Sequence, residues 1–103
     1  DQIVPILSLG GIGVISVLSN ILPRETHNIC EEFMKGNVQK ARELQLKYLS
    51  LINALFSDVN PIPVKEAMNM MGLGMGPLRM PLCPMTDTAR EALRKELAAH
   101  GLV

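Results

Sequence analysis

The chain has 103 residues and a formal net charge of zero, with 48% hydrophobic and 19% charged residues. This length and composition fit one folded domain with a modest core. They exclude a disordered chain and the basic surface of a nucleic-acid-binding protein. No apolar run approaches the roughly 20 residues of a membrane span, and the first residues lack the basic region of a secretory signal. We therefore expect a cytoplasmic protein without a membrane segment.

The first 18 residues predict a helix followed by a strand. Residues 1–9 carry apolar side chains at helical spacing and end at Gly10-Gly11, which is typical of a helix stop and a turn. Gly13 to Leu18 is a β-branched apolar run bounded by turn-forming residues, as in a buried parallel strand. It is the only strand that the sequence predicts.

The rest of the chain predicts helices. Pro23 suits a first helical position and Gly36 a stop, so a helix is expected over 23–35. A second helix follows from residue 37 to about 56, and a third over about 60–71, because their apolar residues recur at helical spacing. Residues 73–85 are an irregular connection, and Thr86 or Thr88 caps a final helix that ends at Gly101.

The order helix, strand, helix in residues 1–36 is that of one repeat of a parallel α/β fold. A lone apolar strand leaves its backbone amides and carbonyls unpaired along both edges, so it needs neighbouring strands that this chain does not encode. The sequence therefore predicts the end of an α/β fold, residues 1–36, followed by a helical domain, residues 37–103. An alternative is a sheet formed between copies of the chain, which would give a helical oligomer.

The cysteine and histidine pattern predicts no metal site. Cys30 and Cys83 have neither CxxC spacing nor the density of a secreted scaffold, so two reduced thiols are expected. His27 and Cys30 are three positions apart on one helix, but no third ligand accompanies them.

Three other patterns that resemble catalytic or binding motifs favour structural roles. The Gly72-to-Gly76 segment follows a helix and lacks a downstream GK[ST], so a helix stop is expected instead of a phosphate loop. Glu31 and Glu32 are typical of a solvated helix face, with Glu31 spaced to pair with Lys35. Lys65 has apolar neighbours suited to a Schiff-base lysine, but it lies in the first turns of an appended helix and not at a strand end.

Three stretches together resemble the dihydrodipicolinate synthase family. They are Leu9-Gly-Gly-Ile-Gly-Val-Ile-Ser-Val17, Asn60-Pro-Ile-Pro-Val-Lys-Glu-Ala67 and Gly76-Pro-Leu-Arg-Met-Pro-Leu82. The resemblance covers essentially the whole chain. The chain is similar to the carboxy-terminal third of the family's proteins. The chain departs from common members at Leu18-Ser19, where a smaller pair is usual.

The resemblance implies a parent (β/α)8 TIM barrel with a carboxy-terminal helical domain, of which this chain is a mostly α fragment with one short strand. Residues 1–9, 13–18 and 23–35 would match the seventh helix, eighth strand and eighth helix of the barrel. Family members condense pyruvate with aspartate semialdehyde in lysine and diaminopimelate synthesis, need no cofactor and are usually homotetramers.

In the family, pyruvate forms a Schiff base with a lysine of the sixth strand, and a tyrosine relays protons. On that template both groups lie before Asp1, so the fragment alone is expected to be inactive. Only one family site residue carries over: Ile15, whose main-chain carbonyl would line the pyruvate pocket. The alternatives are a fragment of N-acetylneuraminate lyase or of a keto-deoxy sugar-acid aldolase, or a helical oligomerisation module based on the apolar Leu49-to-Phe56 stretch.

Overall fold

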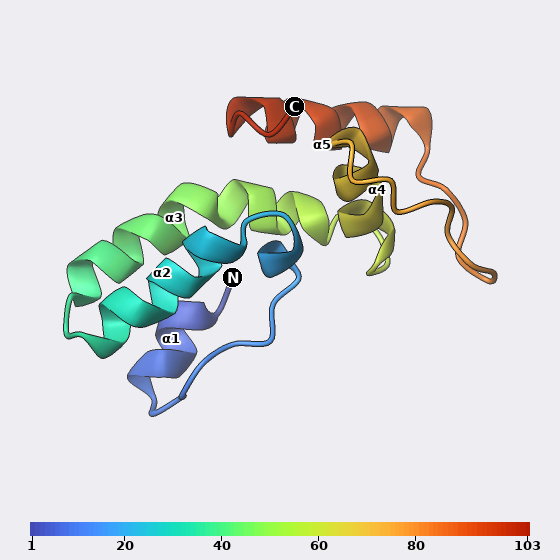
Figure 1. Cartoon of the computed structure of the whole chain (residues 1–103). Coiled ribbons are helices and arrows are strands. Elements are labelled where there is room, and N and C mark those ends of the chain that lie inside the picture. The colour runs from blue at the N-terminus through green and yellow to red at the C-terminus, as the bar shows by residue number, and fades with distance from the viewer. The chain divides into compact units, whose positions relative to one another are not determined.

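The computed structural model describes all 103 residues and is built from helices (Figure 1). In chain order these are α1 (Ile3–Ser8), the 3-10 helix η1 (Leu18–Asn20), α2 (Pro23–Met34), α3 (Val38–Leu55), α4 (Ile62–Met70) and α5 (Asp87–Ala99). The chain forms two compact units, residues 1–50 and residues 51–103, and α3 runs through the boundary between them. The helices expected from the sequence are thus confirmed, with ends that differ from the expected ones by at most two residues.

Unit 1, residues 1–50, is built around the packing of α1 against α2. Its buried cluster consists of Ile3 and Leu7 from α1 and Ile29 from α2. Partly buried side chains from α1, α2 and α3 close over this cluster, namely Val4, Cys30, Phe33 and Leu44. The apolar spacing that predicts α1 and α2 therefore corresponds to the faces that meet in this core.

The predicted strand over residues 13–18 is wrong for this chain. Residues 11–16 form neither helix nor strand, and Leu18 begins η1. The physical reason is that a strand exists only through hydrogen bonds to a neighbour, and no other segment of the chain pairs with this one. A β-branched apolar run indicates which residues suit a sheet, but it does not supply the partner.

Unit 2, residues 51–103, is built around the packing of α4 against α5. Val64 and Ala67 of α4 and Leu93 and Leu97 of α5 are buried. The end of α3 adds Leu51 and Leu55, which are fully buried. Most of the irregular segment that joins α4 to α5 is exposed, so this unit combines a small helical core with a long surface loop.

Glycines end two of the helices as the sequence predicts. Gly36 follows α2 with φ of 88°, and Gly72 follows α4 with φ of 80°, a left-handed conformation that side-chain-bearing residues rarely adopt. Beyond each glycine, the next amide donates back to the helix, from Asn37 to the Glu32 carbonyl at 2.8 Å and from Leu73 to the Met68 carbonyl at 3.0 Å.

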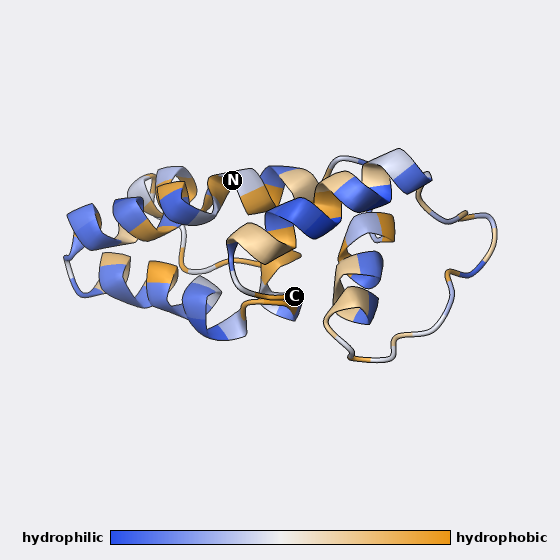
Figure 2. Ribbon diagram, turned by 90° about the horizontal axis from the view of Figure 1, so that it is seen from above, coloured by the Kyte–Doolittle hydropathy of each residue, from blue (hydrophilic) through white to orange (hydrophobic).

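No helix of the structure is both long and apolar enough to cross a membrane. Figure 2 shows hydrophilic and hydrophobic residues in turn along the longer helices, as expected where one face packs on a core and the other meets water.

Candidate functional site

Ile15 lies in the most exposed apolar segment of unit 1. The side chains of Ile12 and Ile15 are 95% and 106% exposed, and that of Val14 is 41% exposed. No backbone amide of residues 12–16 donates a hydrogen bond to another backbone group. This segment therefore combines backbone amides that have no backbone acceptor with exposed apolar side chains, as the edge of an unpaired strand does.

Lys65, the candidate Schiff-base lysine, has a structural partner. Its Nζ donates a 2.6 Å hydrogen bond to the carbonyl oxygen of Pro77 in the loop that follows α4. Lys65 belongs to unit 2, whereas Ile15 belongs to unit 1. The lysine therefore has the geometry of a side chain that holds a loop.

Glu31 and Glu32 of α2 lie on a solvated face, as predicted. Lys35 Nζ lies 2.9 Å from Glu31 Oε1, and the hydrogen bond and the charge of Lys35 lower the pKa of the Glu31 carboxyl. The same pair raises the pKa of Lys35. Glu32 accepts a 2.8 Å hydrogen bond from Asn37. Each carboxylate therefore has its own local partner, and the two do not form an acid and base pair.

The two cysteines and His27 have different surroundings. His27 lies 3.7 Å from Glu31, whereas Cys30 packs at the edge of the unit 1 core, where burial raises the pKa of its thiol. Cys83 is a free thiol in the exposed loop of unit 2. No three histidine, cysteine, aspartate or glutamate side chains gather as metal ligands.

Sequence reasoning missed three side chains that organise the units. Gln45 of α3 accepts a hydrogen bond from the Val4 amide at 2.6 Å and donates one to the Asp1 carbonyl at 2.5 Å. Asn69 of α4 binds the backbone of Met75 and Gly76. These partners lie 6 to 44 positions away in the chain, so helical spacing could not reveal them.

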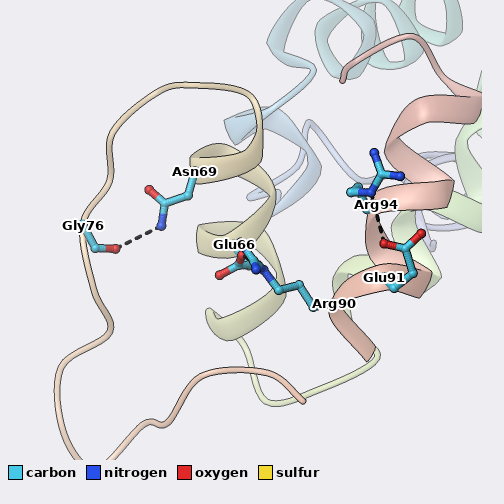
Figure 3. A network of polar contacts seen from close by, with 6 residues as sticks. All are labelled: Glu66, Asn69, Gly76, Arg90, Glu91 and Arg94. Atoms are coloured by element: carbon cyan, nitrogen blue, oxygen red, sulfur yellow. Dashed lines mark hydrogen bonds and ion pairs between the residues drawn. The ribbon is translucent and has the colours of Figure 1, made fainter. Parts of the chain in front are cut away.

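The third missed contact joins the two helices of unit 2. Arg90 of α5 donates to Glu66 of α4 at 2.5 Å (Figure 3). The bond and the charge of Glu66 raise the pKa of the Arg90 guanidinium. A second pair, Arg94 with Glu91 at 3.1 Å, lies within α5. The polar side chains of α4 thus bind α5 and the loop that follows α4.

The chain is similar to proteins of known name over its whole length. It is 63% identical over 103 residues to the 4-hydroxy-tetrahydrodipicolinate synthase of Clostridium perfringens, covering 100% of this chain and 35% of that protein. It is 66% identical over 102 residues to the enzyme of the same name from Caldicellulosiruptor bescii, again covering 35% of the relative. The chain therefore spans about a third of the length of these curated relatives.

Solved structures give the same result. The dihydrodipicolinate synthase of Thermotoga maritima superposes with a TM-score of 0.95 at 43% identity, over 99% of this chain and 35% of that one. A structure described as the first monomeric dihydrodipicolinate synthase variant matches with a TM-score of 0.92 at 43% identity, over 99% of this chain and 34% of that one. The model of the dihydrodipicolinate synthetase family matches residues 1–100. The chain belongs to the dihydrodipicolinate synthetase family.

Proposed function

We propose that residues 1–103 form the carboxy-terminal part of a 4-hydroxy-tetrahydrodipicolinate synthase, a pyruvate-dependent Schiff-base lyase that condenses pyruvate with aspartate semialdehyde. The observation that carries this proposal is the 63% identity to a synthase of that name over every residue of the chain. The parent enzyme would act in lysine and diaminopimelate biosynthesis in the cytoplasm.

The chemistry would depend on groups outside these 103 residues. A lysine that forms an iminium with pyruvate supplies an electron sink, which makes the pyruvate methyl group acidic, and a tyrosine hydroxyl relays the proton. Lys65 does not suit the first role because its ammonium group is bound to the Pro77 carbonyl. The contribution of this chain is therefore structural, and the isolated chain would be inactive.

Ile15 would provide the one direct contact of this chain with pyruvate, through its main-chain carbonyl. Support comes from the backbone amides of residues 12–16, which donate to no other backbone group, and from the match to the Thermotoga maritima structure over 99% of the chain. With neighbouring strands present, the segment would become the last strand of a (β/α)8 barrel. Strand pairing would then fix the direction of the Ile15 carbonyl near the carboxyl end of the strand, which is where the pockets of such barrels lie.

The division of labour would follow the chain. Residues 1–36 would complete the barrel wall, and residues 37–103 would form the carboxy-terminal helical domain of a homotetramer. The alternative of a free-standing assembly module has less support, because Leu51, Ile52 and Leu55 of the apolar stretch at the end of α3 are buried within the chain itself. A sugar-acid aldolase parent has less support because the relatives named above are synthases.

The proposal is tested with a full-length hybrid, in which residues 1–103 replace the matching third of the Clostridium perfringens synthase. We expect the hybrid to condense pyruvate with aspartate semialdehyde, because two proteins 63% identical over this part should share its packing. A folded hybrid that binds pyruvate covalently but forms no condensation product would contradict the proposal.

A second experiment tests the isolated chain. Pyruvate with borohydride reduces a Schiff base to a stable amine, so mass spectrometry reports any lysine that forms one. We expect no labelling of the 103-residue chain and one label per subunit of the hybrid, outside residues 1–103. Stoichiometric labelling at Lys65 would refute the assignment of catalysis to the rest of the enzyme.

A further inference from the structure

The loop between α4 and α5 has an unusual surface. Among residues 72–84, Arg79 is the only charged residue. Several apolar residues of the loop are exposed, with Leu73 at 52%, Met75 at 43% and Met80 at 93%, whereas Leu78 and Leu82 are half-buried. Exposed apolar side chains that gather in one segment mark interaction surfaces more often than single ones do.

The first part of this loop is held in place by α4. Lys65 binds the Pro77 carbonyl at 2.6 Å. Asn69, one helical turn further on, donates to the Gly76 carbonyl at 3.0 Å and accepts from the Met75 amide at 2.7 Å. Figure 3 shows the Asn69 side chain reaching across to Gly76. We call Lys65 and Asn69 the clamp, because together they bind three consecutive loop residues.

Beyond the clamp the loop forms a turn that presents Arg79. The Leu82 amide donates to the Arg79 carbonyl at 3.0 Å, which closes the turn with Met80 and Pro81 at its tip. The Arg79 side chain is exposed and forms no hydrogen bond or ion pair with residues 1–103. A guanidinium carries five donors in a planar fork, so it is suited to a carboxylate acceptor that this chain does not provide at that place.

Resting on the proposed function, we propose that the turn Arg79–Leu82 docks on an apolar surface that carries a carboxylate, located in the part of the same full-length enzyme that lies outside residues 1–103. Arg79 and Met80 are both exposed at this turn, and both residue types are enriched at protein interfaces. The relatives are about three times as long as this chain, so most of such an enzyme remains to cover the turn.

The clamp supports this assignment because it sets the loop before docking. A surface segment that is already ordered loses less conformational entropy on contact than a mobile one. A second copy of the same turn is a poorer occupant. A two-fold contact would bring the Arg79 turns of two copies together and place like charges against each other without a carboxylate between them.

The experiment compares thermal midpoints in two contexts, the full-length hybrid and the 103-residue chain. Arg79→Met keeps an apolar side chain and removes the guanidinium, whereas Arg79→Lys keeps the positive charge without the bidentate geometry. Arg42→Met is the matched control, because Arg42 is an exposed arginine of α3. We expect Arg79→Met to lower the midpoint of the hybrid by about 4 °C or more, the size expected from losing a charge-assisted hydrogen bond. Arg79→Lys should lower it by less, and the 103-residue chain should be unaffected.

The clamp gives a second measurement. Asn69→Ala should also lower the midpoint of the hybrid, and the effect of Arg79→Met should shrink in that background, because a loop that is no longer held presents Arg79 poorly. Purely additive effects would contradict the role of the clamp.

Three results would overturn the docking proposal. The first is that Arg79→Met lowers the thermal midpoint equally in the hybrid and in the 103-residue chain. The second is that Arg79→Met lowers the midpoint of the hybrid no more than Arg42→Met does. The third is that Arg79→Met changes the mass of the hybrid measured by light scattering. The first places the partner within residues 1–103, and the last identifies a second copy as the occupant. Because docking is read from stability, a folded but inactive hybrid would refute the proposed function and leave this test intact.

Discussion

Replacement of Gln45 by leucine is expected to destabilise unit 1 by about 2 kcal/mol. Gln45 is 7% exposed, and its amide binds the Val4 amide and the Asp1 carbonyl at the start of α1. The residue before α1, Gln2, makes no side-chain cap, so Gln45 replaces the missing cap from another helix. Loss of a cap costs about 1 kcal/mol, and loss of a second neutral hydrogen bond costs about 1 kcal/mol more.

The magnitude can be checked by urea unfolding of the 103-residue chain, and by a thermal midpoint expected to fall by roughly 10 °C. Leucine has a volume close to that of glutamine, so the change removes polar contacts without opening a large cavity. Gln39→Leu is the matched control, because Gln39 lies on the same helix but is exposed and pairs only with Glu43. It should cost no more than about 0.5 kcal/mol.

Gln45→Glu adds a pH signature that a simple packing defect would lack. A carboxylate at position 45 accepts from the Val4 amide, but its second oxygen faces the Asp1 carbonyl, which favours the protonated form and raises its pKa in the folded state. Stability should therefore rise as the pH falls through that raised pKa. The role of Gln45 is refuted if Gln45→Leu and Gln39→Leu unfold at the same urea concentration. It is also refuted if the stability of Gln45→Glu does not rise as the pH falls.

Other substitutions test each unit separately. Leu97→Ala should destabilise unit 2 by about 2–5 kcal/mol in urea unfolding, because Leu97 is fully buried. Leu46 is 59% exposed, so the control Leu46→Ala should change stability by no more than about 0.5 kcal/mol. Equal losses of stability in the two variants would contradict the assigned core. Thr86→Ala should lower the free energy of unfolding by about 0.5–1 kcal/mol, since the Thr86 hydroxyl accepts a 3.3 Å hydrogen bond from an amide of the first turn of α5. Thr86→Asn should retain most of this stability, because asparagine also caps helices. Equal losses in the two variants would argue against capping. Glu31→Gln should destabilise the chain slightly at neutral pH. Because Lys35 lowers the folded-state pKa of Glu31, the difference in stability between Glu31→Gln and the unchanged chain should disappear as the pH falls through that lowered pKa. A stability difference that persists in acid, or that does not depend on salt, would exclude the ion pair.

Local signals predicted the helices well. The helix α2 lies within one residue of its expected end, because Pro23 favours a first turn and Gly36 adopts the left-handed conformation that stops it. For α5 two caps were possible, and the structure selects Thr86. Thr88 lies within α5 and Glu91 binds Arg94, so the capping-box spacing of Thr88 and Glu91 does not mark the start of this helix.

The candidate site could be predicted only in part. The resemblance to the dihydrodipicolinate synthase family is confirmed by the match over residues 1–100. The role of Ile15 stays a prediction, because a main-chain carbonyl acquires its direction from strand pairing, and residues 12–16 have no strand to pair with here. Helical spacing does not reveal the clamp, because Lys65 binds the carbonyl of Pro77 in a loop twelve positions away.

The sequence by itself determined where helices begin and end, which faces are apolar and to which family the chain belongs, because those properties depend on residues that are near neighbours or on shared motifs. Tertiary structure decided the rest. Whether residues 13–18 form a strand depends on a partner, and whether Gln45, Asn69 and Arg90 find their acceptors depends on which segments the fold brings together. A helix satisfies its hydrogen bonds within four residues, whereas a strand and a tertiary cap depend on groups that only the folded chain supplies.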